Sequence, residues 1–340
     1  MANQAWQITA PGTLTLNSVG EIPRPGPKQV LLRVHAISLN FRDILVVDHS
    51  PAYPTTAIPN LIPGSDGAGV IESVGADSRW KAGDRVIVHP NSWYTGFDNK
   101  KFDINTVYGG GDVQGTMRGW MILGDEQMVK APKGLSMEEA STMFTAGATA
   151  FRALFHGGVE VGPGTTVLTQ GTGGVSCYAI LLAAAAGATV IATSSSDEKL
   201  ETARKLGAAH LINYRTTPDW ENEVLKVTGG KGVELVVDVV GAESIEQSLK
   251  ATGYGGTIVV VGLLSKDPFK PVNIMTDVLY GVKTGHLGAG SREVSEEMSA
   301  FMEKHDLHPQ VAEVYEFEKA QEALKALTNL TAPGKIVVRC

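Results

Sequence analysis

Apolar and polar residues alternate in the first third of the chain as they do in short β-strands. Between residues 30 and 40, the even-numbered side chains from Val30 to Ala36 share one face of a predicted strand. Glycines punctuate residues 62–75, and a glycine turn leads into a second strand at 85–88. Short strands separated by glycine turns are typical of a small barrel or sandwich. We therefore expect a β-rich domain in this part of the chain.

From Leu135 onward the pattern changes to strands that alternate with helices. The expected strands are 166–170, 189–193, 210–213, 233–240 and 257–261, and the expected helices are 176–186, 197–206, one after Pro218 and one from Ser244. Such alternation predicts right-handed βαβ units and a parallel sheet. The stretch from Ser195 to Glu198 has the form of a capping box for its helix, and Gly207 stands where that helix should end. A last strand, 334–339, is expected to follow helices that return to the first domain.

A glycine-rich loop joins the first strand of this second region to its helix. The segment 170–176 reads Gln-Gly-Thr-Gly-Gly-Val-Ser. Glycines let the backbone approach a pyrophosphate, whose charge the free N–H groups and the helix dipole favour. The alternative is an ordinary tight turn. Because Ser176 replaces the last glycine of the usual fingerprint, we expect looser packing of the helix on the sheet. The predicted cofactor contacts in this loop are Gly171, Thr172, Gly173, Gly174 and Val175.

The end of the second strand of this region decides which dinucleotide we expect. An NAD site usually has an acidic residue there, whereas residues 193–196 read Thr-Ser-Ser-Ser. The Ser195 hydroxyl and the Lys199 ammonium would bind a 2′-phosphate, and Tyr214 and Arg215 would add a ring and a second cation. We therefore expect NADP(H). The alternative is that Ser195 caps a helix and Lys199 is solvated, and the nearby Asp197 is the feature that favours NAD.

Composition excludes several other classes of protein. The chain has 340 residues, 29 basic and 36 acidic, and a formal net charge of −7, without the concentrated basic surface that nucleic-acid binding needs. Hydrophobic residues make up 43%, enough for a folded core. Two cysteines, Cys177 and Cys340, supply neither a disulfide framework nor a four-thiolate zinc site. With no visible signal peptide or membrane span, we expect a soluble cytoplasmic protein that binds a small-molecule substrate, and neither nucleic acid nor membrane.

Several motifs, taken in order, resemble the medium-chain dehydrogenase/reductase superfamily over essentially the whole chain. The matching stretches are 38–43 (Ser-Leu-Asn-Phe-Arg-Asp), 63–69 (Pro-Gly-Ser-Asp-Gly-Ala-Gly), 83–86 (Gly-Asp-Arg-Val), 145–150 (Thr-Ala-Gly-Ala-Thr-Ala) and the loop at Gly171. The resemblance implies an α/β protein with a GroES-like catalytic domain, residues 1–132 and 289–340. It implies a Rossmann doubly wound domain at 133–288, with the active site in the cleft between the two.

The resemblance is to the zinc-independent branch, which includes quinone oxidoreductases and enoyl reductases. By motif position, Asn40, Ser65 and Thr145 stand where zinc-dependent members have Cys, His and Cys ligands. None of the three is a ligand that zinc favours. The segment 91–119, where a structural zinc lobe would fall, contains no cysteine. We therefore expect no metal.

The resemblance also suggests roles for individual residues. The amide of Asn40 would donate to a carbonyl or ribose oxygen, and Tyr53 would donate a proton or a hydrogen bond unless it only packs on neighbouring prolines. Thr145 and Thr149 would line the nicotinamide pocket, or simply start helices. Asp66 would pair with Arg339, either near the pyrophosphate or as a purely structural ion pair. Further expected cofactor contacts are Val240, Gly262, Leu263, Leu264, His286 and Leu287, and the aromatic residues of 91–121 would shape the substrate pocket or pack locally.

These features favour an NADP(H)-dependent enzyme that transfers hydride to an α,β-unsaturated carbonyl compound or a quinone. Conjugate reduction asks less of a metal-free site than alcohol oxidation, because the developing charge spreads into an enolate. The alternatives are a metal-free alcohol dehydrogenase or carbonyl reductase, and a non-redox isomerase or cofactor-binding sensor. We expect two copies to form a homodimer through the strand at 283–287.

Overall fold

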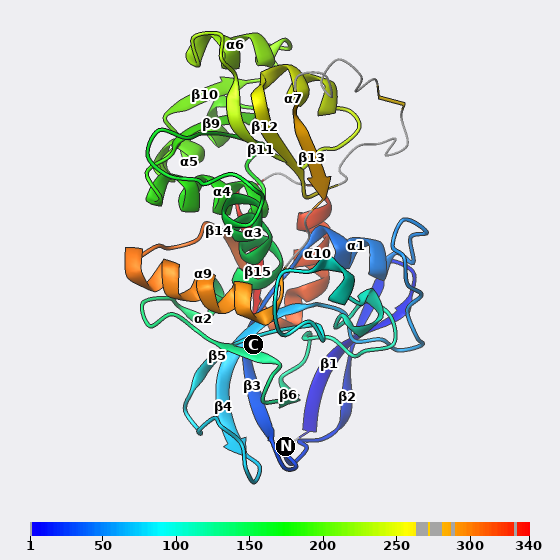
Figure 1. Cartoon of the computed structure of the whole chain (residues 1–340). Helices are drawn as coiled ribbons and strands as arrows, with labels where there is room; N and C mark the ends of the chain where they lie inside the picture. Colours follow the sequence, from blue (N-terminus) through cyan, green and yellow to red (C-terminus); the bar gives the residue numbers. More distant parts are fainter. Residues whose placement is uncertain (1, 263–270, 273–280, 287–289, 330–331) are drawn as a thin grey trace. The chain divides into compact units, whose positions relative to one another are not determined.

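The chain divides into two compact units in the computed structural model, which describes residues 2–262, 271–272, 281–286, 290–329 and 332–340 (Figure 1). The first unit comprises residues 1–145 and 290–340, and the second comprises residues 146–289. The sequence placed the first division at 132/133. Residues 133–145, which include helix α2 (Met137–Ser141), lie with the first unit.

The first unit is built mainly from antiparallel strands. Its larger sheet has the order β14-β15-β3-β4-β5-β7, with β6 also paired to β3, and β1 and β2 form a separate hairpin. The strands are β1 (Ala2–Ala10), β2 (Thr13–Glu21), β3 (Gln29–Ser38), β4 (Asp66–Val74), β5 (Arg85–Val88), β6 (Trp120–Gly124), β7 (Met128–Lys130), β14 (Val311–Glu316) and β15 (Lys335–Arg339). Because β15 pairs with β3, the C-terminal strand does return to the first domain, as predicted.

Helices and short turns complete the first unit. They are α1 (Phe41–Val47), α2, α9 (Arg292–His305), α10 (Ala320–Asn329), the 3₁₀ turns Asn99–Lys101, Ile104–Thr106 and Phe317–Lys319, and a π-helix, Met143–Ala148. The π-helix continues into the second unit.

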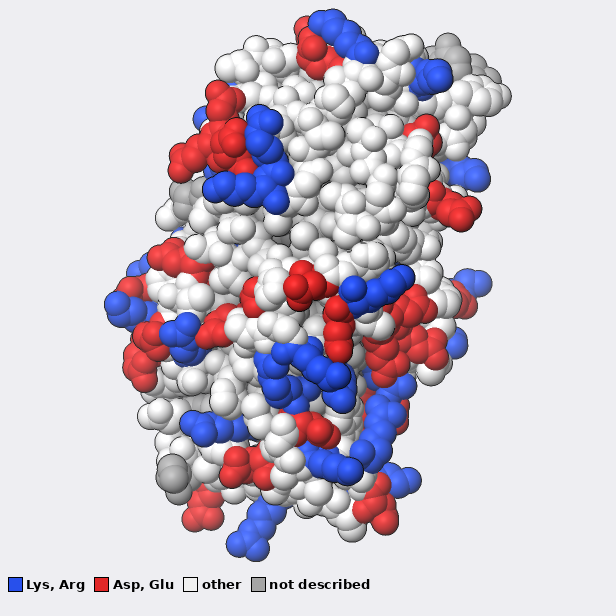
Figure 2. All heavy atoms as spheres, turned by 90° about the vertical axis from the view of Figure 1, so that its left-hand side faces the viewer, with Lys and Arg blue, Asp and Glu red and all other residues white. Residues whose placement is uncertain are grey.

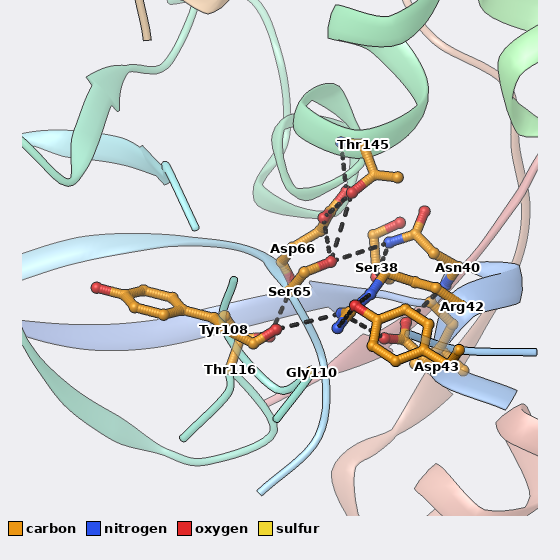
Figure 3. A network of polar contacts seen from close by, with 12 residues as sticks. Ser38, Asn40, Arg42, Asp43, Ser65, Asp66, Tyr108, Gly110, Thr116 and Thr145 are labelled. Atoms are coloured by element: carbon orange, nitrogen blue, oxygen red, sulfur yellow. Dashed lines mark hydrogen bonds and ion pairs between the residues drawn. The ribbon is translucent and has the colours of Figure 1, made fainter. Parts of the chain in front are cut away.

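A bulge in β3 changes which side chains face the core. Val30, Leu32 and Val34 lie in the main core cluster as the alternation predicted, but the next members of that cluster are Ile37 and Leu39. The register of β3 against β4 shifts between Val34 and Ala36, and such a bulge moves the following side chains to the other face. The residues between and after these core positions, Ser38 and Asn40, lie side by side in the candidate site described below (Figure 3).

The second unit is a six-stranded sheet in which every described pair of strands is parallel. The strand order is β10-β9-β8-β11-β12-β13. In chain order within the unit this is 3-2-1-4-5-6, the order of a doubly wound dinucleotide-binding fold. The strands are β8 (Thr166–Gln170), β9 (Thr189–Ser194), β10 (His210–Asn213), β11 (Val233–Asp238), β12 (Thr252–Val260) and β13 (Lys283–His286), and the helices are α3 (Thr149–Phe155), α4 (Gly174–Ala185), α5 (Asp197–Lys205), α6 (Trp220–Val227) and α7 (Ile245–Ala251). The predicted Rossmann architecture is confirmed.

Three local expectations for the second unit are corrected. Ser176 does not loosen α4, because it is 2% exposed and its Oγ donates to the carbonyl of Gln170 at 2.6 Å. The cap of α5 is Ser196, whose hydroxyl accepts from the Lys199 N–H, so the capping box expected with Glu198 does not form. Strand β11 ends at Asp238 and not at the predicted residue 240, because the Asp238 carboxylate accepts the backbone N–H groups of Val240 and Gly241.

Three observations bear on the predicted partners. On the face shown in Figure 2, Lys and Arg side chains are interspersed with Asp and Glu side chains. Among the described residues, no helix combines the length and the apolar character needed to cross a membrane. Among the described strands, β13 lies at one edge of the second sheet and β10 at the other, and pairing of two copies through β13 stays a prediction.

Candidate functional site

Asn40, Ser65 and Thr145, the residues predicted to stand at the three zinc-ligand positions, come together in the first unit, although they are up to 105 positions apart. The distance from Asn40 Nδ2 to Ser65 Oγ is 3.5 Å, and that from Ser65 Oγ to Thr145 Oγ1 is 3.4 Å. Asn40 lies between β3 and α1, Ser65 immediately precedes β4, and Thr145 lies in the π-helix. Figure 3 shows the three side chains converging on one region.

The buried carboxylate of Asp66 holds the side chains of Ser65 and Thr145 in place. This fully buried carboxylate accepts from Ser65 Oγ at 2.7 Å, from Thr145 Oγ1 at 2.5 Å and from the Thr145 N–H at 2.8 Å. The predicted pairing of Asp66 with Arg339 is wrong. Arg339 is at the exposed end of β15, where its guanidinium binds Glu138 at 2.6 Å and Glu316 at 3.5 Å. A cofactor contact by Arg339 stays a prediction.

The donors gathered here do not fit a zinc ion. They are one amide, two hydroxyls and one carboxylate that is already engaged by three hydrogen bonds, whereas zinc in proteins prefers thiolate and imidazole with at most some carboxylate. Elsewhere within the described ranges, His, Cys, Asp and Glu side chains form no group of three or more that could hold a metal. A hydrogen-bonding site is what these side chains can build.

Two charged side chains that the sequence did not single out support Asn40. Lys335, at the start of β15, is 5% exposed, and its ammonium donates to Asn40 Oδ1 at 2.5 Å. Asp43, in the first turn of α1, accepts the backbone N–H of Asn40 at 2.8 Å. Burial raises the pKa of the Asp43 carboxyl, and the adjacent Arg42 opposes that rise. We call the set Asn40, Asp43, Ser65, Asp66, Thr145 and Lys335 the Asn40 cluster.

Tyr53 is held beside this cluster by Arg42. Its hydroxyl oxygen accepts from Arg42 Nε at 3.0 Å and from a terminal nitrogen at 2.8 Å, while the other terminal nitrogen contacts Asp43 at 3.1 Å. With its oxygen occupied as a double acceptor, the phenol has its own proton to donate. A Cβ on Gly110 would lie 2.5 Å from Arg42 Nη2 and 2.8 Å from the Tyr53 hydroxyl, so a larger residue there would displace this pair. Tyr53 also packs against the core, so the packing alternative describes part of its role.

The glycine loop of the second unit has the form that a pyrophosphate site needs. Gly171 has a φ of +72°, which favours glycine, and α4 begins after Gly173 without a side-chain cap. A Cβ built on either glycine meets no atom within 4 Å, so the space beside the helix N-terminus is open. Thr172 Oγ1 lies 3.3 Å from Ser194 Oγ and ties the loop to the end of β9. The loop therefore fits the diphosphate of a dinucleotide.

The residues predicted to bind a 2′-phosphate lie around the end of β9. Because Ser196 caps α5, the alternative role of Ser195 as the cap is wrong, and its half-buried hydroxyl is not used for that purpose. Tyr214 is 41% exposed, immediately after β10. The exposed Asp197 accepts from the side-chain amide of Asn213 at 2.8 Å. The contacts of Ser195, Lys199 and Tyr214 with a cofactor stay predictions.

A second buried polar group, absent from the sequence-based prediction, lies where β8 and β11 end. The fully buried Asp238 carboxylate accepts from Ser248 Oγ at 2.7 Å, Ser244 Oγ at 3.0 Å and Gln170 Nε2 at 3.2 Å, besides the two backbone N–H groups already described. We call these four residues the Asp238 network. A serine pattern six and ten positions after a strand-ending aspartate is the signal that could have revealed it. The network fixes the loop that carries Val240, a predicted cofactor contact.

The structure describes only some of the remaining predicted cofactor contacts. Leu263, Leu264 and Leu287 lie outside the described residues, and of His286 only the backbone, at the end of β13, is described. Gly262 follows β12, and a Cβ there would lie 2.5 Å from the carbonyl oxygen of Val239. Thr149, the first residue of α3, is buried.

Comparison with known families and proteins agrees with this two-unit description. Residues 26–133 match the family model for the alcohol dehydrogenase GroES-like domain, and residues 174–304 match the model for zinc-binding dehydrogenases. The chain is 38% identical over 325 residues to a zinc-type alcohol dehydrogenase-like protein of Schizosaccharomyces pombe, covering 94% of this chain and 93% of that protein. The GroES-like prediction for the first unit is thereby confirmed.

Other similar proteins carry reductase names. A human quinone oxidoreductase is 27% identical, covering 99% of this chain and 97% of its own length, and a 2-haloacrylate reductase of Burkholderia sp is 29% identical over 94% and 92%. Among solved structures, a Sinorhizobium meliloti 1021 protein assigned as an alcohol dehydrogenase superposes with a TM-score of 0.90 at 32% identity, covering 99% and 98%. An NAD-dependent alcohol dehydrogenase gives 0.87 at 31% identity, covering 99% of both chains.

Proposed function

Because the chain belongs to the medium-chain dehydrogenase/reductase superfamily and is an oxidoreductase of that superfamily, we propose that it reduces α,β-unsaturated carbonyl compounds or quinones with NADPH and without a catalytic zinc ion. The observation that carries the proposal is that Asn40, Ser65 and Thr145 stand at the positions expected for zinc ligands and still converge, with Ser65 Oγ 3.5 Å from Asn40 Nδ2 and 3.4 Å from Thr145 Oγ1. None of these side chains is a thiolate or an imidazole, which zinc favours, and all three can donate or accept hydrogen bonds.

A neutral site of this kind suits conjugate reduction. When hydride reaches the β-carbon of an enone, the negative charge spreads over the enolate, and a hydrogen-bond donor can stabilise its oxygen. Bound NADPH would supply the hydride. The Asn40 amide would donate to the substrate oxygen, and Tyr53 would deliver a proton to the α-carbon, its oxygen being held by Arg42.

The names of the relatives support this substrate class. A quinone is a conjugated carbonyl compound, and a 2-haloacrylate has an alkene conjugated to a carboxylate. A quinone accepts hydride at a ring carbon or at oxygen, and a 2-haloacrylate accepts it at the β-carbon; in both, the charge is delocalised over the conjugated system. The names of these two relatives, at 27% and 29% identity, thus describe the type of reduction that hydrogen-bond donors can support without a metal.

The choice of NADPH is supported by the absence of an acidic residue from positions 193–196 and by the engagement of Asp197 with Asn213. An acidic side chain at the end of β9 would repel a 2′-phosphate, whereas a hydroxyl and an ammonium would bind it. The similarity to an NAD-dependent alcohol dehydrogenase at 31% identity is the observation that favours NADH instead.

An assay of NADPH consumption tests the reaction. Purified protein is dialysed against a chelator and mixed with enones, quinones, 2-haloacrylates, saturated aldehydes and saturated ketones, and the loss of absorbance of NADPH is followed. We expect turnover with one or more conjugated acceptors and a fall of at least about 100-fold in kcat for Asn40→Ala, the usual loss for an oxyanion donor. If none of the conjugated acceptors causes NADPH to be consumed, the proposal is overturned.

A charge reversal tests the cofactor choice. Lys199→Glu should raise the KM for NADPH at least about tenfold and leave that for NADH nearly unchanged, because only NADPH has the 2′-phosphate. Lys205→Glu is the matched control, since this exposed lysine is on the same helix but at its other end. Equal effects of the two substitutions would refute a 2′-phosphate contact by Lys199.

Metal-free alcohol oxidation or carbonyl reduction is the second candidate, favoured by two solved structures that are more than 30% identical to this chain and are named as alcohol dehydrogenases. Turnover of simple alcohols or saturated aldehydes after chelation, without turnover of enones, would select it.

A further inference from the structure

A lysine from the end of the chain lies beneath the candidate site. Lys335 begins β15, which pairs antiparallel with β3, and the Leu39 N–H bonds to the Ile336 carbonyl at 3.0 Å. This pairing brings the Lys335 ammonium to the junction of β3 and α1. There it donates to the Leu39 carbonyl and to Asn40 Oδ1, and it is almost fully buried.

The contact with Lys335 decides which end of the Asn40 amide faces the site. An ammonium group has three donors and no acceptor, so only the amide oxygen can face it. Nδ2 therefore points the other way, where its contacts are long: 3.3 Å to the Ser38 carbonyl and 3.5 Å to Ser65 Oγ. These long contacts leave the Nδ2 hydrogens able to bond to a better acceptor, such as a substrate oxygen.

The chemistry of the surroundings also requires an explanation for a buried lysine. Burial lowers the pKa of Lys335, and the carboxylates of Asp66 and Asp43 oppose this effect. Lysine is among the residues least often buried, and replacement of a whole buried group of opposite charges by apolar side chains is often neutral for stability. Packing alone therefore does not explain why an ammonium group and two carboxylates are buried together here.

We propose that Lys335 is a positioning residue that fixes the Asn40 amide with Nδ2 toward the substrate, so that the amide serves as a donor to the developing oxyanion. The inference rests on the proposed reduction, but the orientation of the amide can be measured without it. The competing role is a purely structural one, in which Lys335 supports the junction of β15 with β3.

Nuclear magnetic resonance of the side-chain amides tests the orientation directly. In protein labelled with ¹⁵N-asparagine, the Asn40 pair of signals is identified by its disappearance in Asn40→Ala. We expect this pair to shift in Lys335→Met and to exchange faster with solvent, while the other asparagine side-chain signals stay in place. An unchanged Asn40 pair in the folded variant would overturn the proposal. This result does not depend on which substrate the protein reduces.

A double-mutant cycle on kcat tests the consequence for turnover. Lys335→Met should lower kcat at least tenfold, with the KM for NADPH changed less than twofold. In the Asn40→Ala background the same substitution should have no further effect, because the group through which it acts is gone. Equal losses in both backgrounds would indicate a structural role and overturn the proposal.

Two further variants keep the test decisive if Lys335→Met does not fold. Lys335→Gln retains a polar group but can face either end of the Asn40 amide, so it should give a partial loss of kcat and a partial shift of the signals. Asn40→Asp retains the contact with Lys335 but has no Nδ2, so it should fold as the parent does and lose as much kcat as Asn40→Ala. Full activity in either variant would refute the proposal. If the signals shift but no conjugated acceptor is reduced, the proposed function fails and the positioning stands.

Discussion

The two buried polar groups, one in each unit, are built on opposite principles. The Asp238 network has one carboxylate surrounded by neutral hydroxyl, amide and backbone donors at 2.7 to 3.2 Å. The Asn40 cluster has two carboxylates and an ammonium group, and its amide nitrogen makes only long, weak contacts, of 3.3 and 3.5 Å. The first saturates its carboxylate, whereas the second leaves a donor that is poorly used within the protein.

This difference separates a group that shapes a loop from a group that can act on a substrate. A fully bonded buried network rigidifies the backbone around it, and the Asp238 network does this for the turn at Val240 and Gly241. A donor with long contacts gains most when a stronger acceptor arrives, and an oxyanion is such an acceptor. We therefore expect substitutions in the Asp238 network to lower the stability of the protein, and substitutions in the Asn40 cluster to lower its activity.

The largest expected effect is on the Asp238 network. Asp238→Ala removes the common acceptor of five donors and should lower the free energy of unfolding by about 3 kcal/mol or more, since each buried donor left without a partner costs roughly 1 to 3 kcal/mol. Urea unfolding measures it. Glu234→Ala, an exposed carboxylate on the same strand, is the control and should cost less than about 1 kcal/mol. Similar losses for the two would contradict the account.

The next effect is the dependence of stability on pH. It arises from His89, a buried histidine of the first unit that lies outside the Asn40 cluster. Burial lowers the pKa of His89 to about 4, and its ring Nε2 bonds to the Trp93 carbonyl at 3.0 Å. The unfolded chain, with a pKa of about 6.5, binds a proton that the folded chain rejects. Stability is therefore retained above about pH 6.5 and falls as the pH is lowered toward 4, by about 3 kcal/mol over the window.

Replacement of His89 by a neutral side chain tests this effect. His89→Gln keeps a donor for the Trp93 carbonyl and should flatten the dependence of unfolding free energy on pH between about 4.5 and 6.5. Urea titrations at several pH values measure the slopes. If the parent and the variant lose stability in parallel, the histidine is not the group responsible.

The smallest effect compares two adjacent serines in the second unit. Ser196→Ala removes the cap of α5 and should cost about 1 kcal/mol of stability, the usual value for an N-cap. Ser195→Ala should leave stability nearly unchanged and raise the KM for NADPH. Thermal unfolding and steady-state kinetics on the two variants make the comparison. A loss of stability in Ser195→Ala would contradict the assignment of the cap.

Most features that depend on residues close together in the sequence were predicted well, whereas features that depend on distant residues were not. Strands β8, β9 and β10 were predicted within a residue because their apolar runs and bounding turns are local signals. The bulge in β3 and the cap at Ser196 were missed, since each depends on a shift of one position. The contact of Lys335 with Asn40 joins residues 295 positions apart, and no local pattern specifies it.

The error over Arg339 has a related cause. The sequence showed opposite charges but not burial, and a carboxylate as buried as that of Asp66 takes donors from its immediate neighbours. Motif order, by contrast, predicted that Asn40, Ser65 and Thr145 belong to one site, and the structure brings their side chains close together, while their roles stay predictions.

The most direct test of the metal-free conjugate reduction is the fate of a labelled hydride. Chelator-treated protein is supplied with NADPH carrying deuterium at the transferred position and with an enone, and the product is analysed by proton nuclear magnetic resonance and mass spectrometry. The account predicts deuterium at the β-carbon and solvent hydrogen at the α-carbon. Deuterium at the carbonyl carbon, or turnover that appears only after zinc is restored, would contradict it.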